Sequence, residues 1–119
     1  MPSIVKQISK FTKREIDHLF QHARPIIKNQ ACVILFAPCQ KDSGRVLIVA
    51  SRKVGNAPER NKLRRRIKSI FYEEKFFNLN FDFVIIVYRK MTGLSFDQLK
   101  SLLLSAYDKA LQKNEMFIS

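Results

Sequence analysis

The stretch between residues 52 and 68 concentrates the positive charge of the chain. It holds eight cations and only one acid, Glu59, and therefore carries +7 of the formal net charge of +12. The cations are Arg52, Lys53, Arg60, Lys62, Arg64, Arg65, Arg66 and Lys68. Guanidinium and ammonium groups bind phosphate oxygens, and guanidinium groups also stack on bases. This stretch therefore predicts the binding of a polyanion.

Helical spacing divides the same stretch into two faces. At about 100° per residue, the apolar residues share one arc and the polar residues occupy an adjacent arc. The apolar arc holds Leu63, Ile67, Ile70 and Phe71, and the polar arc holds Asn61, Arg64, Arg65, Lys68 and Tyr72. Like charges four residues apart, as in Arg60, Arg64 and Lys68, destabilise a helix by roughly a few tenths of a kcal/mol. A face that is merely solvated usually mixes signs, so this series favours contact with nucleic acid.

Groups that could make the chain itself a catalyst are not evident. A protein nuclease needs paired carboxylates for metal ions, or a histidine-based acid and base, but the ten acids are scattered and only Glu73 and Glu74 are adjacent. His18 and His22 have the i, i+4 spacing of metal ligands but lack a third one, so we favour an RNA contact or plain exposure. We predict no catalytic residue and no protein-bound metal.

Composition and charge restrict the class of protein. The chain has 119 residues, of which 46% are hydrophobic, with three glycines and four prolines, as expected for one folded domain. The charge excess points to nucleic acid or an acidic membrane. A spanning segment, a secretory signal and a broad aromatic helix face are all missing, so we expect a cytoplasmic protein without a membrane role. The spacing of Cys32 and Cys39 is not a zinc pattern, and free thiols are expected.

The predicted helices and strands follow one another in the order α-β-β-α-β-α. Thr12 and Glu15 form a capping-box pattern, which starts a helix that Pro25 ends. Asn56 and Glu59 have the same spacing ahead of the basic helix, predicted over 57–75, and a third helix begins after Ser95. Strands are predicted over 31–37, 46–51 and 81–88, with a small additional strand over 26–29.

The order of these elements indicates an α+β domain. We expect the strands 31–37 and 46–51 to form an antiparallel hairpin with a long loop, and the helices to cover one side of the sheet. Residues 1–10 are expected to form a flexible basic arm, and residues 1–119 a single RNA-binding domain.

The segment from Ser51 to Arg65 resembles the signature of the bacterial ribonuclease P protein family. That signature reads Ser-Lys-Lys-x-Gly-Asn-Ala-x-x-Arg-Asn-Arg-x-Lys-Arg, and the strand exit, the Gly-Asn-Ala turn and the Arg-Asn pair keep their spacing here. Lys62 replaces an arginine, so charge is kept but the bidentate fork is lost. Ile16 stands where the family usually has an aromatic residue, and Ala23 where it has a glycine.

The resemblance implies a fold. It is an α/β (α+β) single-domain two-layer sandwich with a mixed sheet of about four strands and three helices. It is ribosomal-protein-like and contains a left-handed βαβ crossover, against the general rule of handedness.

The resemblance also implies a function: the protein subunit of ribonuclease P binds the catalytic RNA and the 5′ leader of precursor tRNA and aids removal of that leader. The alternative is a ribosomal or other structured-RNA-binding protein. It implies a monomer, one per RNA, with chemistry carried by the RNA and by Mg²⁺ bound mainly to it. The residues matching the contact to the catalytic RNA are Arg52, Lys53, Asn56, Arg60, Asn61, Lys62, Arg64, Arg65 and Lys68. Those matching a leader-binding cleft, between the first helix and the sheet, are Arg14, Phe20, Phe36, Ser51 and Arg89.

Other interpretations remain open at the level of sequence. Phe20 and Phe36 fit core packing as well as they fit leader contact. A ribosomal or other structured-RNA-binding protein would show the same charge pattern, and a DNA-binding module is a further alternative.

Overall fold

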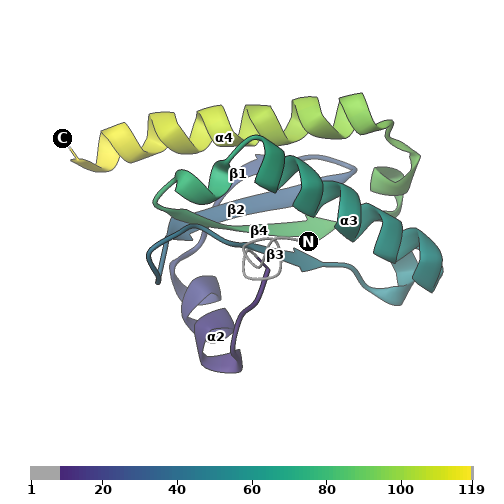
Figure 1. Ribbon diagram of the computed structural model, residues 1–119, viewed down its shortest axis with the longest axis horizontal. Coiled ribbons are helices and arrows are strands. Elements are labelled where there is room, and N and C mark those ends of the chain that lie inside the picture. Colours follow the sequence, from purple (N-terminus) through teal and green to yellow (C-terminus); the bar gives the residue numbers. More distant parts are fainter. Residues whose placement is uncertain (1–8, 119) are drawn as a thin grey trace.

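Helices and strands follow one another in the order that the sequence predicts (Figure 1). The computed structural model describes residues 9–118, with side chains described through residue 113. Most of the predicted basic arm, residues 1–8, thus lies outside the described residues. The elements are α2 (Lys13–His22), β1 (Arg24–Lys28), β2 (Cys32–Pro38), β3 (Val46–Val49), α3 (Ala57–Glu73), β4 (Phe81–Val87) and α4 (Phe96–Ile118). Short 3-10 turns are η1 (Arg52–Val54), η2 (Phe76–Asn78) and η3 (Arg89–Gly93).

The strands within residues 9–118 form one four-stranded mixed sheet in the order β1-β2-β4-β3. The small additional strand is confirmed as β1, but the predicted hairpin of β2 and β3 is wrong, because β4 lies between them. β4 pairs antiparallel with β2 and parallel with β3. Six of its seven residues are buried, and a strand that is apolar on both faces is most stable in the centre of a sheet.

The connection from β3 through α3 to β4 is a left-handed βαβ crossover. In Figure 1 both strands run from left to right, α3 returns in front of the sheet and β4 lies above β3, which defines this hand. Nearly all such connections are right-handed. The left hand agrees with the fold that the family resemblance implied.

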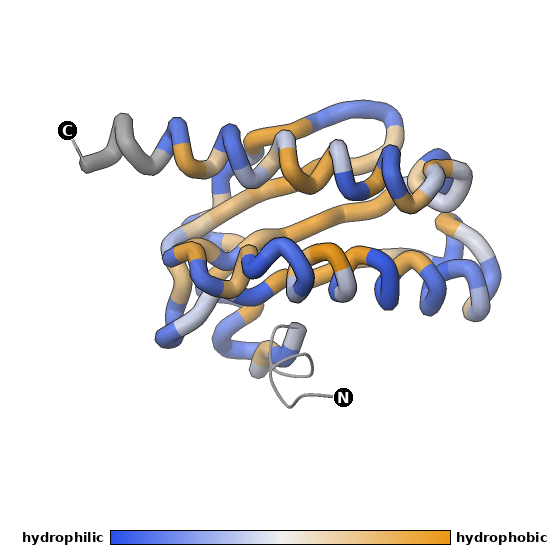
Figure 2. Tube along the Cα trace, turned by 45° about the horizontal axis from the view of Figure 1, so that its top comes forward, coloured by the Kyte–Doolittle hydropathy of each residue, from blue (hydrophilic) through white to orange (hydrophobic). Residues whose placement is uncertain are grey.

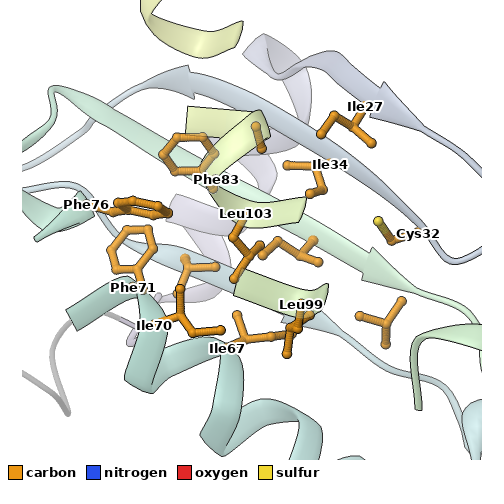
Figure 3. Packing of buried hydrophobic residues seen from close by; sticks show 14 of the residues in the cluster. Ile27, Cys32, Ile34, Ile67, Ile70, Phe71, Phe76, Phe83, Leu99 and Leu103 are labelled. Atoms are coloured by element: carbon orange, nitrogen blue, oxygen red, sulfur yellow. The ribbon is translucent and has the colours of Figure 1, made fainter. Parts of the chain in front are cut away.

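The main core lies between the sheet and the helices α3 and α4. α3 contributes the predicted apolar arc of Leu63, Ile67, Ile70 and Phe71, all buried, and α4 contributes residues such as Leu99 and Leu103 (Figure 3). The Phe71 ring meets Phe76 and Phe83 edge-on, with centroids 5.5 and 6.0 Å apart, a favoured geometry for aromatic pairs. In Figure 2 the hydrophobic colour follows the strands, whereas α3 alternates between hydrophobic and hydrophilic turns.

The opposite face of the sheet is only partly covered, by α2. Leu19 of this helix is buried against Ala37 of β2 and Val84 of β4. The capping box that starts α2 is confirmed, since the Thr12 hydroxyl accepts from the Glu15 amide at 3.2 Å and the Glu15 carboxylate accepts from the Thr12 amide at 2.9 Å. The sheet thus carries α3 and α4 on one face and the short α2 on the other, where part of the face stays open.

Candidate nucleic-acid interface

The start of α3 is fixed by local contacts. The Asn56 side-chain oxygen accepts from the Glu59 amide at 2.9 Å, and the Glu59 carboxylate accepts from the Asn56 amide at 3.3 Å, which confirms the second capping box. A Cβ atom on Gly55 would lie 3.2–3.3 Å from the Glu59 side chain, so a glycine lets Glu59 fold back over the turn. The side-chain oxygen of Asn56 therefore serves the cap.

The cations of α3 have no acidic partner within the part of the chain that the structure describes. Among the residues that the structure describes, the ion pairs involve Lys41, Arg45 and Lys100, and none involves a cation of α3. Asn61, Lys62 and Arg65 are exposed, and Arg64, Arg66 and Lys68 are half-buried. The apolar arc holds the helix on the sheet while the charged side chains remain available to a ligand. Neutralisation of α3 by internal carboxylates, which would contradict a polyanion site, is absent from residues 9–113.

Two of these arginines are oriented by the protein. Arg64 donates from Nη1 to the Asn61 side-chain oxygen at 3.4 Å. Arg60 is half-buried, and its Nε atom is buried without a hydrogen-bond partner among the described residues. Because its Nε atom is buried, one side of the Arg60 guanidinium group is held against the protein.

Further cations gather where β3 and β4 end. Parallel neighbouring strands end at the same edge of a sheet, and here η1 and η3, which follow β3 and β4, contact each other. Arg52 and Lys53 of η1 and Arg89 and Lys90 of η3 are all exposed. Ser51, the residue before η1, is exposed too, and its hydroxyl makes no capping hydrogen bond. The predicted residues Ser51 and Arg89 are thus brought to one edge of the sheet, beside the start of α3.

The α2 face of the sheet exposes apolar side chains next to this edge. Val33 of β2, Ile86 of β4 and Val49 of β3 are in register across three strands. Leu35 and Leu47 flank Val84 in the next row. All five are half-buried or exposed. We call these residues, Val33, Leu35, Leu47, Val49 and Ile86, the open face.

Two of the residues predicted for the leader-binding cleft lie elsewhere. Phe36 is 3% exposed and belongs to the main core, edge-on to Phe81 at 5.3 Å. Successive strand residues point to opposite faces, so its neighbour Leu35 is the residue of β2 that reaches the open face. Arg14 is exposed about 140° around α2 from the buried Leu19, on the outer side of the helix. Phe20, in contrast, is 46% exposed.

Sequence reasoning missed Arg45, which fastens α2 to the sheet. This side chain is almost fully buried and donates from Nη1 to the Lys10 carbonyl at 2.8 Å. Its guanidinium carbon lies 4.1 Å from the centroid of the Phe11 ring. The Arg45 amide donates to the buried carboxylate of Asp82 at 2.9 Å. An arginine directly before an apolar strand reads as a surface residue in sequence, so no local signal identified it.

The polar pairs considered as metal ligands have other roles in the fold. His18 and His22 stack at 4.2 Å, and the His22 Nδ1 atom is 2.9 Å from the His18 carbonyl. No group of three His, Cys, Asp or Glu residues suited to a metal ion occurs in the described part of the chain.

Burial raises the pKa of the Cys32 thiol to about 11. No helix among the described residues has the length and apolar character needed to cross a membrane.

The mixed sheet carries on one side a basic helix whose cations have no acidic partner among the described residues, and on the other side an open apolar face. This combination defines an RNA-binding domain. Residues 7–111 match the family model described as Ribonuclease P. The ribonuclease P protein component of Petrotoga mobilis is 32% identical over 102 residues, covering 82% of this chain and 86% of the relative. That of Thermotoga petrophila is 36% identical over 89 residues, covering 69% and 76%.

Solved structures agree in fold. The RNase P protein from Thermotoga maritima has a TM-score of 0.68 at 30% identity, covering 81% of this chain and 91% of that one. A Staphylococcus aureus RNase P protein has a TM-score of 0.77 at 22% identity, covering 90% and 91%, and supports the fold alone. The chain belongs to the ribonuclease P protein family, whose members take part in processing the 5′ end of tRNA.

Proposed function

We propose that this chain is the protein subunit of a ribonuclease P ribonucleoprotein, which binds the catalytic RNA through α3 and its flanking turns and binds the 5′ leader of precursor tRNA on the open face. The observation that carries the proposal is the set of α3 cations without an acidic partner in the described residues. Such cations favour RNA binding because they displace the counterions that are condensed on the RNA phosphates. The protein acts by neutralising phosphates and holding substrate, not by breaking a bond.

The contact to the catalytic RNA is assigned to the basic helix and the turn before it. The exposed Lys62 and Arg65 and the oriented Arg60 present their charges from a helix that is rigidly packed on the sheet. Rigid placement lowers the entropic cost of binding. Arg52 and Lys53 extend the same charge along the sheet edge.

The leader contact is assigned to the open face and the exposed Phe20. Single-stranded RNA presents base faces that stack on aromatic rings or cover apolar surface without requiring a particular sequence. An open sheet face of half-buried apolar side chains, bounded by Arg89 and Ser51, fits this ligand. The leader contact of β2, predicted from sequence for Phe36, is assigned to Leu35.

Magnesium is proposed to act mainly as a ligand of the RNA subunit. The acids of α3 are engaged within the protein: Glu59 caps the helix, and the Glu73 carboxylate accepts from the Ser69 hydroxyl at 3.1 Å. Phosphate oxygens of a folded RNA are hard ligands of the kind that Mg²⁺ prefers. The chain then lowers the magnesium requirement by supplying positive charge of its own.

The test is reconstitution with a bacterial ribonuclease P RNA. Adding the chain should raise the affinity for precursor tRNA above that for mature tRNA and should allow leader cleavage at a lower Mg²⁺ concentration. Duplex DNA at matched salt serves as the control for charge alone. If the chain left cleavage at low magnesium unchanged, or bound duplex DNA as tightly as precursor tRNA, the proposal would be wrong.

A further inference from the structure

Tyr88 is an exposed aromatic residue with a fixed backbone at the end of β4. Its ring is 44% exposed. Its amide donates to the Ala31 carbonyl at 2.8 Å, and its own carbonyl accepts from the Met91 amide at 3.0 Å. These two hydrogen bonds continue the β2–β4 ladder and start η3. The backbone is therefore fixed while nearly half of the residue stays accessible, which favours binding because little backbone freedom is lost.

Strand alternation places this ring beside the open face. Val84 and Ile86 of β4 face α2, and Tyr88 follows two residues later with extended backbone angles. Ile86 is in register with Val49, which is 37% exposed. The ring of Tyr88 thus prolongs the apolar surface of Ile86 and Val49 towards the sheet edge where η1 and η3 meet.

The surroundings of Tyr88 distinguish between kinds of ligand. Exposed cations stand close by in the chain and at the same edge: Arg89, Lys90, Arg52 and Lys53. An apolar protein partner would have to desolvate these charges without pairing them. Single-stranded RNA satisfies both features, since its phosphates pair with the cations and its bases stack on the ring.

We infer that Tyr88 stacks on one base of the single-stranded 5′ leader, where the leader passes between the basic helix and the open face. This inference rests on the proposed function and adds a contact that the sequence signature did not include. The position is set by topology, because β4 ends beside η1 and hence beside the start of α3. Phe20 and Tyr88 would then be aromatic contacts contributed by different elements.

The experiment measures the affinity of the reconstituted ribonucleoprotein for precursor tRNA and mature tRNA. Tyr88→Ala should weaken binding of the precursor by roughly 5-fold or more, the loss of one stacked base, and leave binding of mature tRNA at the wild-type value. Tyr88→Phe keeps the ring and should retain most of the affinity. Circular dichroism of both variants verifies folding.

A scan of the leader with single abasic nucleotides identifies the stacked base. At one position the abasic substitution should weaken wild-type binding but not add to the effect of Tyr88→Ala, because the two changes remove the same contact. The inference would be overturned if the Tyr88→Ala complex bound precursor tRNA as tightly as the wild type. It would also be overturned if the losses from Tyr88→Ala and from the abasic substitution were additive at every leader position. A wild-type complex that does not distinguish precursor from mature tRNA would instead overturn the proposed function.

Discussion

The Nη2 atom of Arg45 lies 3.0 Å from Oε2 of Glu15, so a buried guanidinium group at the start of β3 joins the sheet to α2. The same atom lies 3.8 Å from Oδ2 of Asp82, whose side chain is fully buried. Gln40 adds to this junction by donating from its side chain to the Glu15 carbonyl at 3.0 Å. Since α2 bears Phe20, this buried network determines where one aromatic residue stands relative to the open face.

Replacing Arg45 by methionine should destabilise the fold. The change keeps a long side chain but leaves the Asp82 carboxylate buried without a cation, and breaking a buried pair on one side costs about 3–5 kcal/mol. The free energy of unfolding, from urea titration monitored by circular dichroism, measures this. Lys41→Met is the matched control, because Lys41 also pairs with Glu15, at 3.8 Å, but is 63% exposed. Its cost should stay below about 0.5 kcal/mol, and equal costs for the two variants would contradict the argument.

Acid should remove the stabilisation that Glu15 provides. The backbone hydrogen bond from Thr12, followed by the bond from Arg45, lowers the pKa of Glu15 from 4.5 to about 2. A carboxyl group whose pKa is lower in the folded state stabilises the fold above its unfolded pKa and loses this effect as pH falls through its folded pKa. The stability difference between the wild type and Glu15→Gln should be full above pH 4.5 and vanish towards pH 2.

Ionisation of Asp82 should have the opposite effect on stability from ionisation of Glu15. Burial raises the pKa of its carboxyl group despite the hydrogen bonds from the Arg45 and Gln40 amides and the charge of Arg45, so its ionisation destabilises the fold as pH rises through that raised pKa. Thermal unfolding across the acid range, measured for the wild type and for Glu15→Gln, separates the two contributions. The variant lacks the titration of Glu15 and keeps that of Asp82. A difference between these proteins that did not change with pH would show that Glu15 does not act through its charge.

The charges of α3 should determine the salt dependence of RNA binding. Arg65→Gln removes an exposed cation of the basic helix, and each lost phosphate contact should lower the slope of log affinity against log salt by about 0.7–0.9. Lys109→Gln removes the same charge from an exposed position on α4 and should leave the slope unchanged. Filter binding to the catalytic RNA at several salt concentrations measures both, and indistinguishable slopes would argue against α3 as the contact surface.

Gly44 should not tolerate a side chain. A Cβ atom there would lie 2.2 Å from the Phe81 carbonyl oxygen and 2.9 Å from that of Leu79, and backbone atoms cannot move aside as a flexible side chain can. Gly44→Ala should therefore cost at least about 1–3 kcal/mol, as overpacking does. Gly93→Ala is the control, because nothing lies within 4 Å of a Cβ atom at that position. Thermal unfolding with equal midpoints for the two variants would refute the prediction.

Local patterns in the sequence determined the helices and the charge of the site. Both capping boxes, the apolar arc of α3 and the extra strand before β2 are present as predicted, because each depends on neighbours within about four residues. The crowding of cations between Arg52 and Lys68 is likewise a local property. These features sufficed to predict a nucleic-acid-binding domain, and the resemblance to the ribonuclease P protein family specified RNA.

Tertiary structure alone decided which faces the strands present and which strands pair. Phe36 and Leu35 are adjacent in sequence, yet strand alternation sends the first into the core and the second to the open face, and the sequence does not say which face is covered. The pairing of β3 with β4 instead of β2, the burial of Arg45 against Glu15 and Asp82, and the meeting of Tyr88 with the sheet edge join residues tens of positions apart. Such contacts depend on the free energy of packing the whole chain, which no local spacing encodes.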